Sequence, residues 1–204
     1  PKIQRNEISV LNESERKNLQ NHLVNNLNNT NIGILLTMYS GMRIGEICAL
    51  KWSDIDLQSG IIRISKTVQR INDKIGNSKT KIIVGSPKSR TSEREIPIPN
   101  FLVNILNERR QNENNYILSG THKLIEPRTM QNRFKSVLKK CGIRNVNFHL
   151  LRHTYATVCI ENGFDAKTVS ELLGHSNVNI TLNRYVHSSL DTKKKYVEKL
   201  NFVA

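Results

Sequence analysis

The sequence predicts a mainly α-helical protein that contains one small three-stranded antiparallel β-sheet. Much of the chain carries apolar residues at intervals of three or four positions, which is the spacing of one helix face. The middle of the chain instead holds short isoleucine-rich segments separated by Gly, Ser, Asn and Pro, as strands joined by turns do. No break in composition divides these parts, so we expect one domain over residues 12–187.

The amino-terminal part of this domain predicts three helices. Residues 12–27 begin with an Asn or Ser that can cap a helix, and leucines then recur at intervals of four. Residues 32–39 are apolar on most sides, which indicates a buried helix that ends at Gly41. A further helix is expected over 43–52, with its Ile, Cys and Leu side chains facing inward.

The strands follow in the middle of the chain. We expect them over 59–65, 79–85 and 93–99, where isoleucine partly alternates with polar residues. Residues 86–92, "SPKSRTS", contain turn-forming residues and are expected to join the last two strands. The three strands together predict the small antiparallel sheet.

Helical spacing returns in the carboxy-terminal half. Pro127 in a first turn and Gly142 after a last turn mark the two ends of one expected helix. The expected helices there cover residues 100–111, 127–141, 149–162, 166–173, 177–186 and 190–201. We interpret residues 1–11 as a linker, which suggests a fragment of a longer protein, and residues 188–204 as a C-terminal tail helix.

The charge of the chain points to a polyanionic partner. The 31 Lys and Arg residues outnumber the 17 Asp and Glu residues, which gives a formal net charge of +14. Nucleic acid is the favoured partner, while a solvated basic surface and an anionic membrane are the alternatives. No apolar run approaches the roughly 20 residues of a membrane-spanning helix, so we expect no membrane partner.

The cysteines argue against a disulfide scaffold. Cys48, Cys141 and Cys159 are far apart in apolar helical patterns and have no Cys-x-x-Cys spacing. Such scattered cysteines are typical of reduced thiols, so we expect a cytoplasmic protein.

Two groups of basic residues could bind a phosphate. His149 and Arg152 are three residues apart, so both lie on one face of a first helical turn, whose free N–H groups also attract anions. Taken alone, such a pair is more often a surface histidine beside an arginine. Arg43 opens another helix, and Glu46, three residues on, could hold its guanidinium in place or form an ordinary helix ion pair.

The remaining polar candidates are weaker when each is taken alone. His149 and His153 have the spacing of a helical zinc pair, but no Glu stands between them and no third ligand follows, so we expect no metal. Lys88 is expected at a hairpin tip, where it could reach a ligand or simply face solvent. Arg90 and Arg94 nearby allow the same two interpretations.

Residues 166–186 also have the pattern of a helix-turn-helix motif. Gly174 separates two short helical patterns, as it would in a DNA-reading unit. In that interpretation Asn179, Thr181 and Asn183 would face bases. Tyr185, taken alone, is typical of a half-buried core tyrosine.

Four segments, taken together in chain order, change the interpretation of these candidate residues. They are "SGMRIGEICALKWSDID", "PKSRTSEREIPIP", "HLLRHTYAT" and "LLGHSNVNITLNRYVH". Their order and spacing resemble the catalytic domain of the tyrosine recombinases, the phage-integrase family. The sequence looks most like integrases of phages and conjugative transposons of low-GC bacteria. The resemblance covers roughly residues 10–187 and implies the fold shared by tyrosine recombinases and type IB topoisomerases.

The resemblance implies a complete set of site residues. Lys79 and Lys81 are alternatives for the hairpin lysine, and Arg90 is a further expected DNA contact. The implied positions are Arg43 as the first arginine with Glu46 as its buttress, Lys88 as the hairpin lysine, His149 and Arg152 as the His-x-x-Arg pair, His175 as the second histidine, and Tyr185 as the nucleophile.

The chemistry implied by the resemblance is DNA strand cleavage and rejoining without a metal or other cofactor. Two arginines would neutralise the phosphate, because a guanidinium is permanently charged and binds phosphate oxygens in a fork. Tyr185 would form a 3′-phosphotyrosyl intermediate, with His149 as proton acceptor and Lys88 as donor to the leaving 5′ oxygen.

The resemblance further implies a site-specific recombinase that integrates and excises a mobile element in the bacterial nucleoid. Expected partners are double-stranded DNA, three further copies of the chain in a tetrameric complex on DNA, and an accessory excision factor. The tail would pack on a neighbouring protomer. A non-catalytic helix-turn-helix regulator and a type IB topoisomerase-like relaxing enzyme remain the alternatives.

Overall fold

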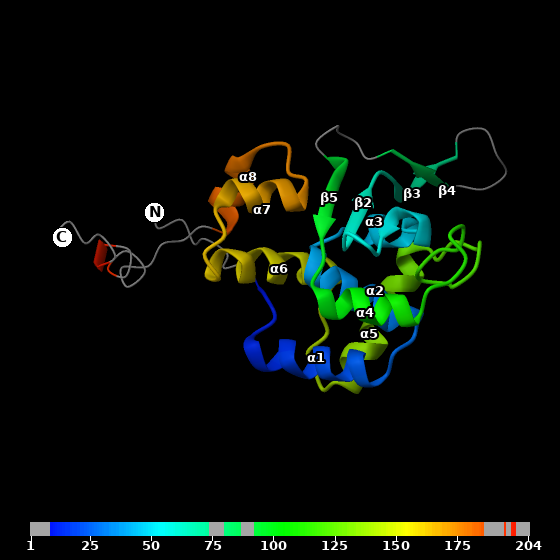
Figure 1. Cartoon of the computed structure of the whole chain (residues 1–204), viewed down its shortest axis with the longest axis horizontal. Coiled ribbons are helices and arrows are strands. Elements are labelled where there is room, and N and C mark those ends of the chain that lie inside the picture. The colour runs from blue at the N-terminus through cyan, green and yellow to red at the C-terminus, as the bar shows by residue number, and fades with distance from the viewer. Residues whose placement is uncertain (1–8, 74–79, 87–91, 186–193, 195–196, 199–204) are drawn as a thin grey trace.

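The computed structural model describes residues 9–73, 80–86 and 92–185, together with 194, 197 and 198 near the C-terminus. Helices dominate this part of the chain, as expected (Figure 1). The α-helices are α1 (Glu13–Asn25), α2 (Asn29–Ser40), α3 (Ile44–Ala49), α4 (Asn100–Glu108), α5 (Pro127–Lys140), α6 (His149–Glu161), α7 (Ala166–Leu173) and α8 (Val178–Tyr185). Each matches an expected helix within a few residues, while the expected helix over 190–201 lies almost wholly outside the described residues.

Local side chains explain where these helices begin and end. Asn12 accepts a hydrogen bond from the backbone N–H of Glu15, whose carboxylate accepts one from the N–H of Asn12, so α1 starts with a capping box. Helix α2 ends at Gly41, whose φ of 63° lies in the left-handed region. Asp165 caps α7 through the N–H of Thr168, and Gly174 ends that helix with a φ of 65°.

The three-stranded antiparallel sheet is present, but one of its strands differs from the expected set. Strands β1 (Ile55–Asp56), β2 (Ile61–Ile64) and β5 (Arg94–Pro97) pair in the order β1-β2-β5. Ile62 lies opposite Ile96 in this register. The expected strands over 59–65 and 93–99 are therefore neighbours, and β1 is the third member.

The expectation that residues 79–85 join this sheet was wrong. They form β4 (Thr80–Gly85), which pairs antiparallel with β3 (Thr67–Asn72) in a separate two-stranded ribbon. The partner strand was missed because its sequence, TVQRIN, has only two apolar residues and does not look like a strand. The expected turn over 86–92 lies mostly outside the described residues.

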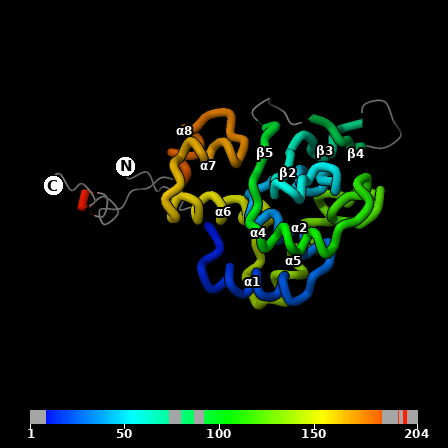
Figure 2. Tube along the Cα trace, in the orientation of Figure 1, coloured from blue at the N-terminus to red at the C-terminus, as the bar shows by residue number. Residues whose placement is uncertain are grey.

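Two apolar clusters hold the described chain together. The larger one involves α1 to α6 and the sheet, and Leu11, just before α1, is buried in it. A second, smaller cluster lies among α6, α7 and α8; its members are Ala156, Cys159, Val169, Leu173 and Tyr185. Figure 2 shows α7 and α8 beside one end of α6, away from the ribbon of β3 and β4. Helices α7 and α8 thus pack on α6 around a small apolar cluster of their own.

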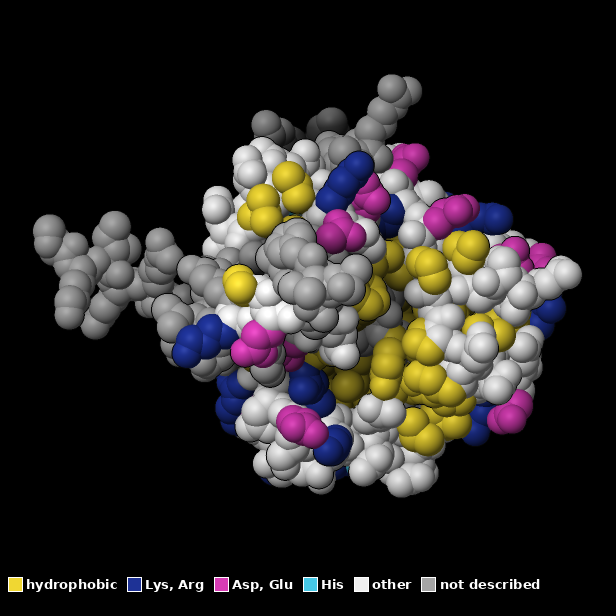
Figure 3. All heavy atoms as spheres, turned by 60° about the vertical axis from the view of Figure 1, so that its left-hand side comes forward, with side chains coloured by type: hydrophobic (Ala, Val, Ile, Leu, Met, Phe, Trp, Pro, Cys, Tyr) yellow, Lys and Arg dark blue, Asp and Glu magenta, His cyan; other side chains and the backbone are white. Residues whose placement is uncertain are grey.

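Three further features of the described residues are the exposed apolar side chains, the free thiols and the lengths of the helices. On the face in Figure 3, apolar side chains reach the surface in one broad area with charged side chains around it. Ile180 and Leu182 on α8 are among the exposed large apolar residues. The three cysteines are free thiols. Within the described ranges, no helix has the length and apolar character needed to cross a bilayer.

Candidate active site

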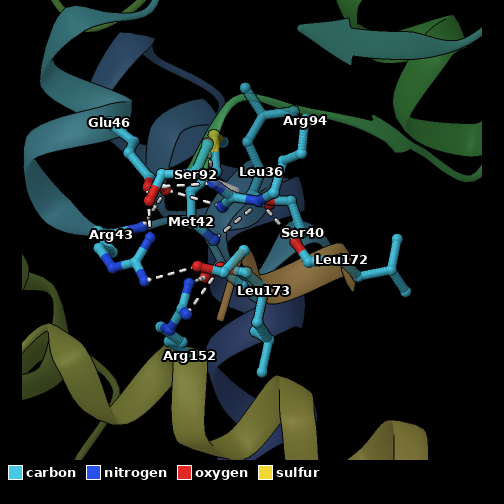
Figure 4. A network of polar contacts seen from close by, with 12 residues as sticks. Leu36, Ser40, Met42, Arg43, Glu46, Ser92, Arg94, Arg152, Leu172 and Leu173 are labelled. Atoms are coloured by element: carbon cyan, nitrogen blue, oxygen red, sulfur yellow. Dashed lines mark hydrogen bonds and ion pairs between the residues drawn. The ribbon is translucent and has the colours of Figure 1, made fainter. Parts of the chain in front are cut away.

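Three arginines from three elements meet at the C-terminal end of α7. Arg94 on β5 donates from Nε to the carbonyl oxygen of Leu172 over 2.7 Å, and Arg152 on α6 donates from Nη2 to that of Leu173 over 2.7 Å. Arg43, which precedes α3, donates from Nη2 to the carbonyl oxygen of Gly174 over 3.2 Å. We call these three residues the arginine cluster (Figure 4). The last carbonyls of a helix lack intrahelical partners and carry partial negative charge, so they suit guanidinium groups.

Glu46 lies between two members of the arginine cluster. Its side chain is only 2 % exposed and accepts hydrogen bonds from Arg43 Nη1 at 2.8 Å and from Arg94 Nη2 at 2.8 Å. Burial opposes ionisation of this carboxyl, but the hydrogen bonds and charges of Arg94 and Arg43 outweigh it and hold its pKa below the ordinary value. Glu46 therefore lies where the sequence expected a buttress for Arg43, and it also binds Arg94.

Arg152 is the most deeply buried of the candidate phosphate ligands. It is 2 % exposed, and its Nη1 donates to the carbonyl oxygen of Gly41 over 2.9 Å. Burial, together with the charge of Arg43, lowers its pKa to about 9, so it stays protonated at neutral pH. A side chain at Gly41 would also crowd its neighbours, because a Cβ there would lie 2.6 Å from Tyr155 and 2.7 Å from Leu173.

Tyr185, at the end of α8, is hydrogen-bonded to His153 on α6. Its hydroxyl oxygen is 2.6 Å from His153 Nδ1, and the residue is 7 % exposed. Burial raises the pKa of the Tyr185 phenol, against the charges of Arg152 and Arg184. Desolvation and the charges of His149, Arg184 and Arg152 lower the pKa of His153 to about 4, so its ring is neutral at pH 7. With a protonated phenol beside a neutral imidazole, Tyr185 donates to Nδ1 when the ring hydrogen is on Nε2, and Nδ1 donates to the phenol oxygen when the hydrogen is on Nδ1.

His153 is the site residue that the sequence did not predict. Its spacing to His149 suggested only a metal pair, and the two rings do meet edge-on, with centroids 4.5 Å apart. Within the described residues, no group of three His, Cys, Asp or Glu side chains is placed to hold a metal ion. His149 itself reaches the surface at the start of α6, and its pKa is lowered by desolvation and by Arg152, Arg184 and Arg43.

His175 follows Gly174, which ends α7 and separates it from α8, as the two helical patterns in the sequence indicated. Its Nδ1 is 2.8 Å from Thr181 Oγ1, and desolvation, with the charges of Arg152 and Arg43, lowers its pKa to about 4. Thr181 is fully buried. That burial is at odds with the helix-turn-helix interpretation, in which Thr181 faces bases.

The structure thus brings Arg43, Glu46, Arg152, His175 and Tyr185 to one end of α6 and α7. Lys88 and its alternative Lys79 lie outside the described residues, as does Arg90. Lys81 is described on β4, where its Nζ lies 3.6 Å from the Asp73 carboxylate. An arginine pair, two histidines and a phenol around one point can bind a phosphodiester and present an oxygen nucleophile to it.

Sequence comparisons show which family the chain resembles. The family model described as the phage integrase family matches residues 9–191. A protein named tyrosine recombinase XerC-like, from Caldanaerobacter subterraneus subsp. tengcongensis, is 36% identical over 186 residues, which cover 82% of this chain and 48% of that protein. A tyrosine recombinase XerA from Thermococcus onnurineus is 30% identical, with 83% of this chain and 55% of that protein covered. The chain therefore spans about half the length of these relatives.

Solved structures share the fold. The Tn1549 transposon integrase in complex with a circular intermediate DNA superposes with a TM-score of 0.75 at 20% identity, covering 98% of this chain and 68% of that one. The catalytic domain of bacteriophage HP1 integrase superposes with a TM-score of 0.61 at 19% identity, covering 97% of this chain and all of that one, 100%.

Proposed function

The chain belongs to the phage integrase family, and we propose that it is the catalytic domain of a site-specific tyrosine recombinase. It cleaves and rejoins DNA strands through a covalent bond to Tyr185, for the integration and excision of a mobile element. The observation that carries this proposal is the meeting of Arg43, Arg152 and the Tyr185 phenol at the end of α7.

The arginine pair would hold the scissile phosphate. Arg43 and Arg152 are each fixed by two described hydrogen bonds, which engage only part of the N–H donors of each guanidinium. Glu46 and the α7 carbonyls would keep both groups oriented before DNA arrives, so little reorganisation is needed during the reaction. His175, with Nδ1 bonded to Thr181, would use its other ring nitrogen as a further donor to the phosphate. His149, at the surface beside Arg152, would add a contact on the same phosphate.

The phenol oxygen of Tyr185 would attack the phosphorus, and the 5′ oxygen would leave. The product is a 3′-phosphotyrosine bond, which retains the energy of the phosphodiester for rejoining. Lys88, whose hairpin lies outside the described residues, is our proposed proton donor to the 5′ oxygen. Arg90, on the same segment, is a proposed DNA contact.

The assembly follows from this role. The formal charge of +14 supports binding to double-stranded DNA, and the Tn1549 relative was solved bound to DNA. We propose a tetramer on DNA, in which the segment 188–204 packs on a neighbouring protomer, and an accessory factor that favours excision. The protein would work in the bacterial nucleoid.

A covalent trapping experiment tests the proposal. The 204-residue chain is incubated with a labelled pool of nicked duplexes whose sequence is randomised around the nick, so that the short 5′ fragment diffuses away after cleavage. Wild-type protein should give a DNA-linked band on a denaturing gel, and Tyr185→Phe should give none while it retains DNA binding. Absence of the band with the wild-type chain would overturn the proposal.

The same samples separate the alternatives. A helix-turn-helix regulator would bind DNA and give no band, and Tyr185→Phe would be indistinguishable from the wild type. A type IB topoisomerase-like enzyme would give the band and would also relax a supercoiled plasmid without a partner site.

A further inference from the structure

The hydroxyl of Tyr185 lies 2.6 Å from Nδ1 of His153, and Arg184 also forms a side-chain hydrogen bond to Tyr185. We propose that His153, rather than His149, accepts the phenolic proton when Tyr185 attacks the phosphate. This inference rests on the proposed function, because it assigns a role within the same site. It concerns the proton of the nucleophile and leaves the proposed phosphate contacts of Arg43 and Arg152 unchanged.

The geometry singles out His153 among the histidines of the site. Its Nδ1 is 2.6 Å from the Tyr185 oxygen, which is the distance of a short O–H···N hydrogen bond. His149 meets the His153 ring edge-on, and its centroid lies 4.5 Å from that of His153. His175 is bonded to Thr181 instead. Of the described histidines, His153 is the one whose ring nitrogen lies within hydrogen-bond distance of the Tyr185 hydroxyl.

The proposal requires one tautomer of His153. For Nδ1 to accept from the phenol, the neutral ring must carry its hydrogen on Nε2. An imidazole in this state can take a second proton without turning, and the phenol needs no rearrangement before it reacts. Tyr185 belongs to the small apolar cluster of α6, α7 and α8, and His153 lies on α6.

The proton balance of the step is complete. The Tyr185 oxygen forms its bond to phosphorus, the bond from phosphorus to the 5′ oxygen breaks, and the phenolic proton moves to His153 Nδ1. The 5′ oxygen takes a proton from its separate donor, for which we have proposed Lys88. In rejoining, the 5′ hydroxyl attacks phosphorus and His153 returns its proton to Tyr185.

The charges around His153 explain why the transfer waits for DNA. In the free protein, desolvation and the positive charges of Arg184 and Arg152, with His149 alongside, disfavour a protonated His153. A bound phosphate adds negative charge beside Arg152 and so offsets part of that repulsion. Proton affinity at His153 therefore rises when the substrate is in place.

Two substitutions distinguish proton transfer from simple positioning. The trapping experiment first identifies a cleaved sequence, which is then used as a single nicked duplex for rates at saturating DNA. His153→Phe keeps the ring and removes the acceptor, and it should lower the rate of adduct formation about 100-fold or more. His153→Asn keeps an acceptor oxygen near the place of Nδ1 but cannot take a full proton, so it should be similarly slow. Recovery with Asn to within about threefold of wild type would show that His153 only positions Tyr185 and would overturn the proposal.

A sulfur substrate separates this proton from the one on the leaving group. A duplex whose scissile 5′ bridging oxygen is replaced by sulfur releases a thiolate, which needs no proton donor. This duplex should restore cleavage to Lys88→Ala and should not restore it to His153→Phe. Rescue of His153→Phe would place the lost proton at the 5′ side and overturn the proposal.

Two further measurements test the tautomer of His153 and the DNA binding of its variants. Nitrogen NMR of the free wild-type chain should show His153 with Nδ1 unprotonated, and Tyr185→Phe should shift that signal; an Nδ1–H tautomer would contradict the inference. Fluorescence anisotropy should show DNA binding by both His153 variants within severalfold of wild type. If wild type forms the Tyr185 adduct and both His153 variants match its rate, this inference fails while the proposed function stands. If wild type forms no adduct, the proposed function itself fails.

Discussion

The buried ion pair of Arg94 and Glu46 gives the sharpest stability prediction. In Arg94→Met, Glu46 loses two hydrogen bonds, at 2.8 and 3.1 Å, and the carbonyl oxygen of Leu172 loses its 2.7 Å bond. The side chains of Arg94 and Glu46 are 5 % and 2 % exposed, so water cannot replace the lost partner. Removing one partner of a buried pair typically costs about 3 to 5 kcal/mol of unfolding free energy, and we expect a loss in that range.

The neighbouring sheet offers a matched control. Arg63 and Glu95 form an ion pair at 3.2 Å across β2 and β5, but both side chains are 61 % exposed. Arg63→Met should therefore cost at most about 1 kcal/mol, because exposed pairs contribute little. Urea unfolding at pH 7, followed by circular dichroism and extrapolated linearly, measures both variants.

The stability difference between Arg94→Met and the wild type should also depend on pH. The pKa of Glu46 is lowered in the folded chain, so its contribution to stability is present above the ordinary value of 4.5 and is lost as the pH falls through the folded pKa. Without Arg94 that pKa should rise toward the ordinary value, so the acid-dependent loss of stability should be smaller and span a narrower pH range than in the wild type. The reasoning is refuted if Arg94→Met costs no more than Arg63→Met.

Three further predictions concern the site. Gly41→Ala should lower the free energy of unfolding by well over the about 1 to 2 kcal/mol that a left-handed alanine costs, because its Cβ would meet Tyr155 at 2.6 Å. Gly142→Ala is the control: the φ there is 66° and no atom lies within 4 Å, so it should lose only the conformational part. Equal losses of stability in thermal unfolding would contradict this prediction. Arg152→Lys should lower adduct formation about 100-fold or more in the trapping assay, since a lysine cannot reproduce the fork between Gly41 and Leu173, and near-normal rates would argue against the phosphate role. The pKa of His175 is about 4 in the folded chain against an ordinary value of 6.5, so the unfolded chain binds more protons between these two values. The free energy of unfolding should therefore fall as the pH drops from 6.5 to 4. In urea unfolding, His175→Asn should make this fall less steep, and an unchanged pH dependence would contradict the prediction.

Local patterns predicted the helices well and the sheet only in part. Caps and glycine stops depend on residues within a few positions, so the ends of α1, α2 and α7 could be read from the sequence. Strand pairing depends on distant partners, and residues 79–85 gave no sign that they would prefer the polar strand β3 to the sheet. A local hairpin between Asn72 and Thr80 closes a shorter loop than pairing across the sheet would.

The candidate site was predicted where motifs carried it and missed where contacts did. Arg43, Arg152, His175 and Tyr185 stand in short recognisable segments. Arg94 gained its importance from Glu46, 48 positions away, and from Leu172, 78 positions away, which no local pattern reveals.

His153 was missed for a different reason. It was noticed only as a possible metal ligand beside His149, because a spacing of four along a helix suggests that pairing. Its actual partner is Tyr185, 32 positions away. The partner in this hydrogen bond lies on another helix, so the spacing on α6 alone could not identify it.

The end of α7 gives the molecule a form of mechanical coupling. Leu172, Leu173 and Gly174 are consecutive, and each carbonyl oxygen holds a guanidinium from a different part of the chain. Any shift of α7 along its axis would loosen all three arginines in concert instead of one at a time. Helix α7 is followed directly by the segment that carries Tyr185, so a displaced α7 would misplace the nucleophile and loosen the arginine cluster at the same time. Such an all-or-none linkage would keep a half-assembled site from cutting DNA.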